Sequence, residues 1–300
     1  MFCKIGAVIT TYKPDDGFIQ RIDVLKSACE RVIVVDNTPG GHKFAEPVGF
    51  VLLQDGTNKG LGAALNIGIQ EARRSGCNRI LLLDQDSSPS LEFVERMSKA
   101  YDEISQLHGD RVCIGPSHMD DMLERGRPVF LPGTGWQEVS CLATSGMMFS
   151  LDMLGVRDAF SLDLFLDFVD FDWCWRMRKN GWRIFRLSSV RMPHRLGLAQ
   201  RKFLIVKYHV PAPYRHYYQF RDTLRLISKS HTPFYAKFRL FLILLPKLIL
   251  FPFLLDSGTQ RLKWMLLGIR DAVYNRGGIG AGAAVLQVNS RKAEFLSTTG

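Results

Sequence analysis

The sequence contains six cysteines in 300 residues, and none of them lies in a CxxC motif or at a zinc-binding distance from a histidine. This pattern excludes a structural zinc site and a disulfide framework. Because several cysteines lie within apolar runs, we expect free, mostly buried thiols in a reducing compartment. The first residues also lack the long apolar segment of a signal peptide, so a cytosolic protein is expected.

Two glycine-rich signatures are missing as well. Gly60-Leu-Gly62 has no third glycine at the place that the dinucleotide-binding pattern G-x-G-x-x-G requires. The turn after the first apolar run, Thr10 to Pro14, contains one lysine and no glycine. A nucleotidyltransferase is expected to carry a glycine-rich basic phosphate loop there. A dinucleotide-binding enzyme and a nucleotidyltransferase are therefore both disfavoured.

The sequence also lacks an uninterrupted apolar segment of membrane-spanning length. Residues 234–255 are the most apolar stretch, but charged residues and prolines interrupt them, namely Lys237, Arg239, Pro246, Lys247 and Pro252. A spanning helix with a lysine near its centre is costly. We expect an amphipathic pair of helices lying in the membrane interface. The alternative is a helical hairpin buried against the catalytic domain or a partner subunit.

Positive charge is concentrated in one segment. Residues 200–276 contain 14 Lys and Arg but only 3 Asp, whereas the whole chain has a net charge of +10. A basic segment of this kind favours an anionic membrane surface as partner. Its interleaved aromatic and arginine residues, 214–225, would also suit single-stranded nucleic acid. That alternative does not explain the polar residues that follow the predicted strands in the first third of the chain, so no nucleic-acid partner is expected.

The first third of the chain alternates apolar runs with helical patterns. Apolar runs at residues 4–9, 31–35, 48–53 and 80–83 predict strands, and the spacing predicts helices over residues 15–29 and 90–107. This alternation is typical of an α/β sheet with largely parallel strands. Further strands are predicted near residues 112–115 and 182–187, and an aromatic helix over residues 165–179.

Polar residues follow the predicted strands in a regular way, at Thr10–Tyr12, Asp36-Asn37, Asn58–Gly62 and Asp84–Asp86. Ligands of open α/β sheets bind at the carboxyl ends of the strands. Two carboxylates at i and i+2 could share a divalent cation, although a solvated acidic turn is the alternative. The glycines permit close approach of a ligand, and the start of the following helix offers free N–H groups to an anion.

These motifs together resemble one known family. Thr10-Thr-Tyr-x-Pro14, Val-Val-Asp-Asn37, Asn58-Lys-Gly-Leu-Gly-Ala63 and Leu-Asp-Gln-Asp86 look like the donor half of an inverting family 2 glycosyltransferase with the GT-A fold. The run at residues 165–176, Gly181-Trp182 and His194-Arg-Leu-Gly197 are similar to its acceptor half. The bacterial rhamnosyltransferase branch is the best match, and the resemblance covers roughly residues 4–276.

The resemblance implies a nucleotide-diphospho-sugar transferase fold, which is a Rossmann-like mixed sheet flanked by helices. Residues 1–110 would form the nucleotide-sugar-binding half of this α/β domain, and residues 111–212 its acceptor-binding half. Residues 213–276 would be a basic, apolar, helical segment that associates with the membrane. Residues 277–300 would be a tail.

The resemblance also implies roles for the donor-side residues. Thr10, Thr11 and Tyr12 would line the base pocket, and Asp36 would accept a hydrogen bond from the pyrimidine ring N–H. Asn58, with the glycines at 60 and 62, would lie along the ribose and diphosphate.

A metal site is implied in the same way. Asp84 would face the ribose or a metal-bound water. Asp86 would ligate Mg²⁺ or Mn²⁺, and this cation would bridge the diphosphate. His194 would be a further ligand or a diphosphate contact.

Asp170 matches the general base of the family. Val169 stands where the family has glutamate, so the choice among Asp167, Asp170 and Asp172 stays open. These acids could instead favour a helix N-terminus through its dipole, and Asp172 could form an ion pair with Arg176 on the helix surface.

The acceptor-binding residues implied by the resemblance are Ser145, Gly146, Asp172 and Arg176. Thr144-Ser145-Gly146 could equally be a tight turn. The tryptophans at 173, 175 and 182 are expected in the core rather than as a sugar platform.

The function that the resemblance implies is metal-dependent, inverting transfer of L-rhamnose from dTDP-L-rhamnose to a hydroxyl of a lipid-linked saccharide in bacterial surface polysaccharide (O-antigen) synthesis. The predicted location is cytoplasmic and peripheral, on the inner face of the plasma membrane. A UDP-hexose donor is the alternative, because the sequence does not distinguish thymine from uracil. It also leaves open whether the chain forms a homo-oligomer.

Overall fold

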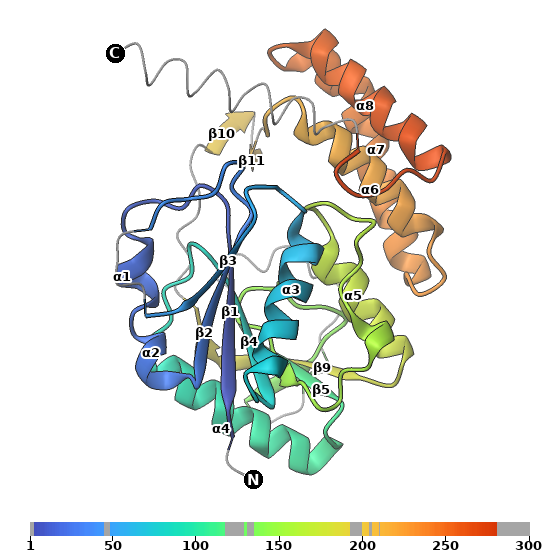
Figure 1. The fold of residues 1–300 in the computed structure, drawn as a ribbon. Coiled ribbons are helices and arrows are strands. Elements are labelled where there is room, and N and C mark those ends of the chain that lie inside the picture. The colour runs from blue at the N-terminus through green and yellow to red at the C-terminus, as the bar shows by residue number, and fades with distance from the viewer. Residues whose placement is uncertain are drawn as a thin grey trace. The chain divides into compact units, whose positions relative to one another are not determined.

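The protein folds as two compact units in a computed structural model (Figure 1). The structure describes residues 3–44, 49–117, 135–192 and 211–280, together with the backbone of short strands at 129–130, 200–203 and 206–209. Unit 1 comprises Met1–Ser161 and Asp170–Arg195. Unit 2 comprises Leu162–Val169 and Leu196–Gly300.

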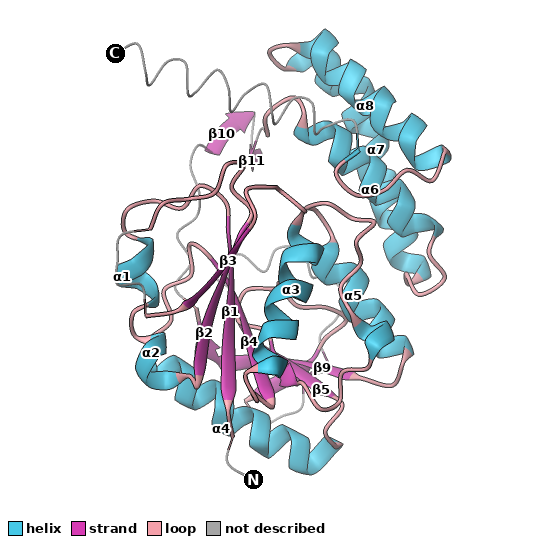
Figure 2. Cartoon of the chain, in the orientation of Figure 1, coloured by secondary structure: helices cyan, strands magenta, loops and turns pink. Residues whose placement is uncertain are grey.

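Unit 1 is built on a mixed sheet flanked by helices (Figure 2). The sheet has nine strands in the order β3-β2-β1-β4-β8-β5-β9-β7-β6. The strands β3, β2, β1 and β4 are parallel, and β8 runs antiparallel between β4 and β5. The strand bounds are β1 Ile5–Thr11, β2 Arg31–Asp36, β3 Val51–Gln54, β4 Arg79–Asp84, β5 Val112–Ser117, β6 Val129–Phe130, β7 Trp136–Glu138, β8 Met148–Ser150 and β9 Arg183–Arg191.

Helices cover both faces of this sheet. One face packs against α1 (Phe18–Ile22), α2 (Leu25–Ala28) and α4 (Leu91–His108). The other face packs against α3 (Leu61–Arg74) and α5 (Val169–Lys179). A short 3-10 turn (Val156–Asp158) precedes α5 in the chain. Because both faces are covered, Ile80 to Leu83 are fully buried, as their apolar run predicts. The predicted α/β fold with a mixed sheet is therefore confirmed.

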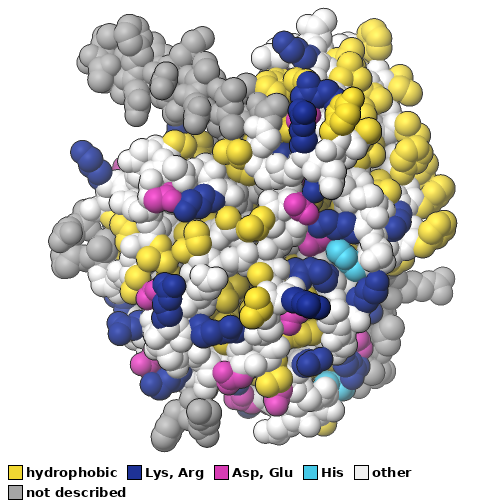
Figure 3. Space-filling model, turned by 45° about the vertical axis from the view of Figure 1, so that its right-hand side comes forward, with side chains coloured by type: hydrophobic (Ala, Val, Ile, Leu, Met, Phe, Trp, Pro, Cys, Tyr) yellow, Lys and Arg dark blue, Asp and Glu magenta, His cyan; other side chains and the backbone are white. Residues whose placement is uncertain are grey.

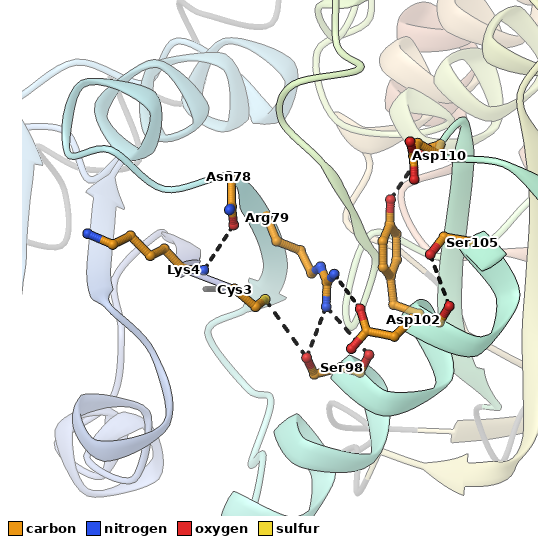
Figure 4. Close-up of polar contacts among 9 residues, drawn as sticks. Cys3, Lys4, Asn78, Arg79, Ser98, Asp102, Ser105 and Asp110 are labelled. Atoms are coloured by element: carbon orange, nitrogen blue, oxygen red, sulfur yellow. Dashed lines mark hydrogen bonds and ion pairs between the residues drawn. The ribbon is translucent and has the colours of Figure 1, made fainter. Parts of the chain in front are cut away.

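Two contacts set how closely the helices approach the sheet. A Cβ on Gly68 of α3 would lie 2.3 Å from Val8 Cγ1, so glycine lets this helix lie directly on β1. On the opposite face, Arg79 of β4 donates hydrogen bonds to Ser98 Oγ (3.0 Å) and Asp102 Oδ1 (2.7 Å) of α4 (Figure 4). Its guanidinium also lies 4.1 Å from the ring centroid of Tyr101.

Unit 2 is mainly helical. It contains α6 (Arg215–Ser228), α7 (Phe234–Leu254), α8 (Gly258–Val273) and a two-stranded hairpin of β10 (Gln200–Phe203) and β11 (Val206–His209). Phe220, Leu244 and Met265 form a core between the three helices. Within the described ranges, no helix combines the length and hydropathy needed to cross a membrane.

Three helix predictions differ from the structure. The single helix predicted over residues 15–29 is two short helices, α1 and α2. The helix predicted from residue 165 begins only at Val169, because Phe168 adopts a left-handed φ of +68°. The predicted pair of helices in residues 234–255 is one helix, α7, with Pro246 and Pro252 inside it.

Candidate functional site

The predicted polar segments lie at one edge of the parallel strands. The chain adds β2 and β3 on one side of β1 and then places β4 on the other side, so β1 and β4 form the switch point of the sheet. The register pairs Thr11 with Asp36 and Thr10 with Asp84. Ligands of α/β sheets bind at such switch points, at the carboxyl ends of the strands. The expected nucleotide-binding residues are therefore neighbours.

Asp36 ends β2 and is 2% exposed. Its Oδ1 accepts hydrogen bonds from the hydroxyls of Thr11 and Thr38, each at 2.8 Å. Its Oδ2 accepts the backbone N–H of His42 at 3.0 Å. The carboxylate thus fixes the loop after β2, and Oδ2 keeps the acceptor capacity that a nucleobase N–H would need.

The loop before α3 is attached to the end of β2 through Asn37. Asn37 Nδ2 donates to the carbonyl of Gly60 (3.1 Å), and Asn37 Oδ1 accepts the backbone N–H of Lys59 (3.4 Å). Asn58 Oδ1 accepts the N–H of Gly60 (3.0 Å), whose φ is +85°. This left-handed conformation favours glycine. The loop therefore brings the first turn of α3 to the edge where Asp36 lies.

Gly62 has a packing role that the sequence did not indicate. A Cβ at this position would lie 2.3 Å from the carbonyl oxygen of Ser161. Four residues later, Asn66 forms two hydrogen bonds with the backbone of Phe160, at 2.9 and 2.8 Å. Gly62 and Asn66 together hold the segment at 160–161 on α3. The predicted contact of Gly62 with the diphosphate stays a prediction.

The turn Asp84-Gln85-Asp86 is held through its middle residue. Gln85 Oε1 accepts the backbone N–H of Tyr12 at 2.7 Å, which joins the ends of β1 and β4. The Gln85 carbonyl accepts a hydrogen bond from Arg21 Nη2 at 3.1 Å. The acids on either side, Asp84 and Asp86, are partly exposed. Sequence reasoning missed Gln85 and Arg21, although the position of Gln85 between two acids is a local signal.

Ser145 and Gly146 lie next to this turn. The hydroxyls of Ser87 and Ser145 are 2.6 Å apart, and Ser87 Oγ also accepts the N–H of Asp84 (3.2 Å). The Gly146 N–H donates to the carbonyl of Leu82 (2.7 Å), and φ of Gly146 is +86°. Ser145 is only 1% exposed, so its hydroxyl supports the turn that follows β4.

A divalent cation would find oxygen ligands at this turn. Carboxylate oxygens are the ligands that Mg²⁺ and Mn²⁺ prefer, and Asp84 and Asp86 supply them. Within the part of the chain that the structure describes, no three His, Cys, Asp or Glu side chains form a metal-binding group. The other predicted ligand, His194, lies outside the described residues.

The three candidate bases differ in their surroundings. Asp172 is 0% exposed, and its Oδ2 lies 3.9 Å from Arg176 Nε, one turn further along α5. Arg176 also donates to the carbonyl of Arg157 (2.8 Å), and its burial lowers its pKa. Asp167 belongs to unit 2, where it pairs with Arg215. Asp170 lies in the first turn of α5 and is partly exposed.

The tryptophans of this region are core residues, as predicted. Trp173 stacks on Phe160 with ring centroids 5.1 Å apart, and its Nε1 donates to the carbonyl of Asp158 (2.8 Å). Trp175 and Trp182 are also buried. These contacts fix α5 within unit 1 from Trp173 onward, beyond the first turn that carries Asp170.

Comparisons with known proteins concern the fold and the sequence as a whole. No family model matches the chain. The dTDP-rhamnosyl transferase RfbF of Shigella flexneri is 28% identical over 256 residues, which are 80% of this chain and 85% of that protein. The crystal structure of Staphylococcus aureus TarS 1-349 superposes with a TM-score of 0.51 at 16% identity, over 90% of this chain and 81% of that chain.

A more distant neighbour is GalNAc-T7, whose crystal structure contains UDP, GalNAc and Mn²⁺. It has a TM-score of 0.46 at 11% identity, and the match covers 64% of this chain but only 44% of GalNAc-T7. The similarity to RfbF confirms the predicted resemblance to rhamnosyltransferases and the predicted enzyme class, a glycosyltransferase. The fold is the predicted GT-A type. The roles of individual residues stay predictions.

Proposed function

We propose that this glycosyltransferase moves L-rhamnose from dTDP-L-rhamnose to a hydroxyl group of a lipid-linked saccharide, with inversion at the anomeric carbon. The observation that carries the proposal is the switch point of the sheet. There Tyr12 and Gln85 join the ends of β1 and β4, and Asp36 and Asn37 hold the neighbouring loops. The rhamnosyl donor follows from the similarity to RfbF. A UDP-hexose is the alternative donor.

The donor would bind along this edge, within residues 1–110. Asp36 Oδ2 would accept the N3–H of thymine, and Thr10 to Tyr12 would line the base. Asn58 and the amides at the start of α3 would face the diphosphate, because a helix N-terminus attracts anions.

Asp86 would hold the divalent cation, with Asp84 beside it facing the ribose. The cation would offset the negative charge that grows on the leaving diphosphate.

Asp170 would act as the general base, in the acceptor-binding half at residues 111–212. The acceptor hydroxyl oxygen forms a bond to the anomeric carbon while the bond from that carbon to the diphosphate oxygen breaks. The electron pair of the broken bond leaves with dTDP, and the hydroxyl proton moves to the Asp170 carboxylate. Of the three candidate acids, Asp170 combines partial exposure with a position in unit 1. Ser145, Gly146, Asp172 and Arg176 would support the acceptor side.

Two substitutions test these roles. Asp170→Asn is expected to lower kcat about 10²–10⁴-fold, the usual contribution of a general base, with little change in the Kd for dTDP-L-rhamnose. Asp86→Ala is expected to abolish the part of donor affinity that depends on the cation. Asp152→Asn, at an exposed acid of unit 1, is the matched control. Loss of donor binding in Asp170→Asn would contradict the role of this residue as base.

The same proposal places the enzyme on an anionic membrane surface through α7. Three of the eleven exposed large apolar residues of α7, Ile243, Leu250 and Leu254, lie elsewhere on the helix. On a helix with 3.6 residues per turn, the other eight form one stripe. They are Phe234, Tyr235, Phe238, Phe241, Leu242, Leu245, Ile249 and Phe253. Hydrophobic side chains gather with Lys and Arg on the upper right of Figure 3.

Charge favours a lipid surface as the occupant of this stripe. Lys237 and Arg239 lie on either side of it, whereas Ala236 and Leu244 on the opposite face of α7 are buried. An apolar stripe flanked by cations is the pattern of helices that lie in the headgroup region of anionic bilayers.

Co-sedimentation with vesicles tests this part of the proposal. The protein is expected to bind vesicles of phosphatidylglycerol and phosphatidylcholine more tightly than vesicles of phosphatidylcholine alone. The double variant Lys237→Glu/Arg239→Glu is expected to weaken binding at least about tenfold, since each basic residue contributes about 1 kcal/mol. The control is Arg178→Glu/Lys179→Glu on the exposed end of α5. Equal binding to both vesicles, or self-association that covers the stripe, would contradict the proposal.

A further inference from the structure

One segment of unit 2 interrupts the sequence of unit 1. The chain leaves unit 1 after Ser161, which Gly62 accommodates on α3, and returns to it at Asp170. The eight residues between them, Leu162–Val169, belong to unit 2. We call them the strap. The strap is thus the covalent connection that leads directly to the proposed general base.

One face of α6 holds the strap. Residues spaced by about one helical turn or its multiples share a face of a helix. Four residues of α6 that contact the strap have this spacing, and they are Arg215, Tyr218, Asp222 and Arg225. Their partners in the strap appear in reverse order, so the strap runs antiparallel to α6 as a ladder of contacts.

The two outer contacts of the ladder are ion pairs. Arg215 Nη2 donates to Asp167 Oδ1 at 2.9 Å. At the other end, Arg225 Nη2 lies 3.3 Å from Asp163 Oδ2. The carbonyl of Asp163 also accepts the backbone N–H of Gly278 at 2.9 Å. Both ends of the strap are therefore fixed by side chains of opposite charge.

The central contact is buried. Phe165 stacks on Tyr218 with ring centroids 4.6 Å apart and an interplanar angle of 18°. The backbone N–H of Phe165 donates to Asp222 Oδ2 at 3.3 Å, while Asp222 Oδ1 accepts a hydrogen bond from Arg221 Nε at 2.7 Å. Arg221 and Asp222 are both fully buried. Burying an ion pair is costly. Here Asp222 Oδ2 of the buried pair accepts the backbone N–H of Phe165 in the strap.

The strap ends in a restricted backbone conformation. Phe168 has a φ of +68°, which residues other than glycine adopt only where the surrounding structure enforces it. Val169 follows as the buried first residue of α5, and Asp170 is the next residue. The direction in which α5 begins is therefore coupled to the conformation of the strap.

We propose that Arg215, Asp222 and Arg225 are positioning residues that hold the strap and, through it, set the place of the Asp170 carboxylate. The inference rests on the proposed role of Asp170 as general base. Misplacement of a reacting group by about 1 Å can reduce the rate by about 10²-fold. Release of the strap should therefore lower the rate of transfer while the donor site, built from other segments of unit 1, still binds.

The test uses Arg215→Ala in the full chain, with Arg276→Ala of the same unit as the matched control. Arg215→Ala is expected to lower kcat at least about tenfold and to leave the Kd for the donor within about twofold. The control is expected to change neither. Arg215→Lys, which keeps the charge, and the exchange Arg215→Asp/Asp167→Arg are each expected to restore a large part of kcat. Asp222 is avoided because its substitution could unfold the buried pair.

Hydrogen exchange gives a readout that does not depend on activity. The amide of Phe165 and its neighbours in the strap are expected to exchange faster in Arg215→Ala than in the wild type or in Arg276→Ala. The wild type could transfer no sugar while Arg215→Ala still speeds amide exchange in the strap. This result would overturn the proposed function but support the ladder of contacts between the strap and α6. An active wild type with kcat of Arg215→Ala within twofold of Arg276→Ala would overturn this inference alone.

Discussion

Gly62→Ala is the substitution whose cost follows most directly from the structure. The added Cβ would lie 2.3 Å from the Ser161 carbonyl oxygen, much closer than van der Waals contact allows. The neighbouring atom is backbone, so a change of side-chain rotamer cannot relieve the clash. The segment at 160–161 must therefore move away from α3 or the start of α3 must shift.

Two contributions set the magnitude. Insertion of a methyl group into a packed site costs about 1–3 kcal/mol. Movement of the segment also weakens the hydrogen bonds of Asn66 with Phe160, at 2.9 and 2.8 Å, each of which contributes about 1 kcal/mol. A total loss of about 3 kcal/mol corresponds to a decrease in Tm of roughly 6–12 °C for a unit of this size.

Thermal unfolding followed by circular dichroism measures this effect. Gly155→Ala is the matched control, because its Cβ would approach only the carboxylate end of the flexible Asp158 side chain, at 3.3 Å. The control is expected to unfold within about 2 °C of the wild type. A Tm of Gly62→Ala equally close to that of the wild type would refute the packing argument and leave ligand contact as the reason for this glycine.

Two further predictions concern the cation and pH. A chelator is expected to stop nucleoside diphosphate release, and added Mg²⁺ or Mn²⁺ to restore it; activity that persists in a chelator would contradict the role of Asp86. Burial and the nearby Arg261 lower the pKa of His216 to about 4, so the folded protein resists protonation of a group that the unfolded chain protonates near pH 6.5. When the pH is lowered from 6.5 to 4, the free energy of unfolding should therefore decrease. The decrease should be up to about 3 kcal/mol larger in the wild type than in His216→Phe. Parallel pH profiles in urea titrations would contradict this. Asp222, whose pKa burial raises to about 6, contributes in the opposite direction in both proteins.

The strand ends could be predicted from sequence because their signals are local. An apolar run such as Ile80 to Leu83 marks a strand buried on both faces, and the polar residues after it mark where the strand leaves the sheet. Parallel pairing then brings Thr10, Asp36 and Asp84 together without further information. The burial of the three tryptophans in the core could be predicted from their apolar character alone.

The helix boundaries were wrong where tertiary structure overrides local pattern. Apolar spacing continues through residues 165–168, but contacts with α6 hold this segment as a non-helical strap that ends in the left-handed Phe168. In α7 the prolines suggested a break, yet the helix continues through Pro246 and Pro252. Single-sequence periodicity does not contain these effects.

Side-chain contacts between distant parts of the chain could not be predicted either. Arg215 and Asp167 are 48 residues apart, and neither residue type indicates the other as its partner. The aromatic and basic residues of α6 suggested a surface for single-stranded nucleic acid. The structure instead buries Tyr217, Tyr218 and Phe220, so the stacking platform that this alternative required is absent from the described part of α6.

The most direct test of the central claim is the release of nucleoside diphosphate from a panel of sugar nucleotides. The purified protein would be mixed with Mg²⁺, a lipid-linked saccharide acceptor and, in turn, dTDP-L-rhamnose, UDP-glucose or UDP-galactose. We predict acceptor-dependent release of dTDP from dTDP-L-rhamnose, much slower release of UDP, and loss of release in Asp86→Ala. Failure of every sugar nucleotide to bind or turn over under these conditions would contradict the account.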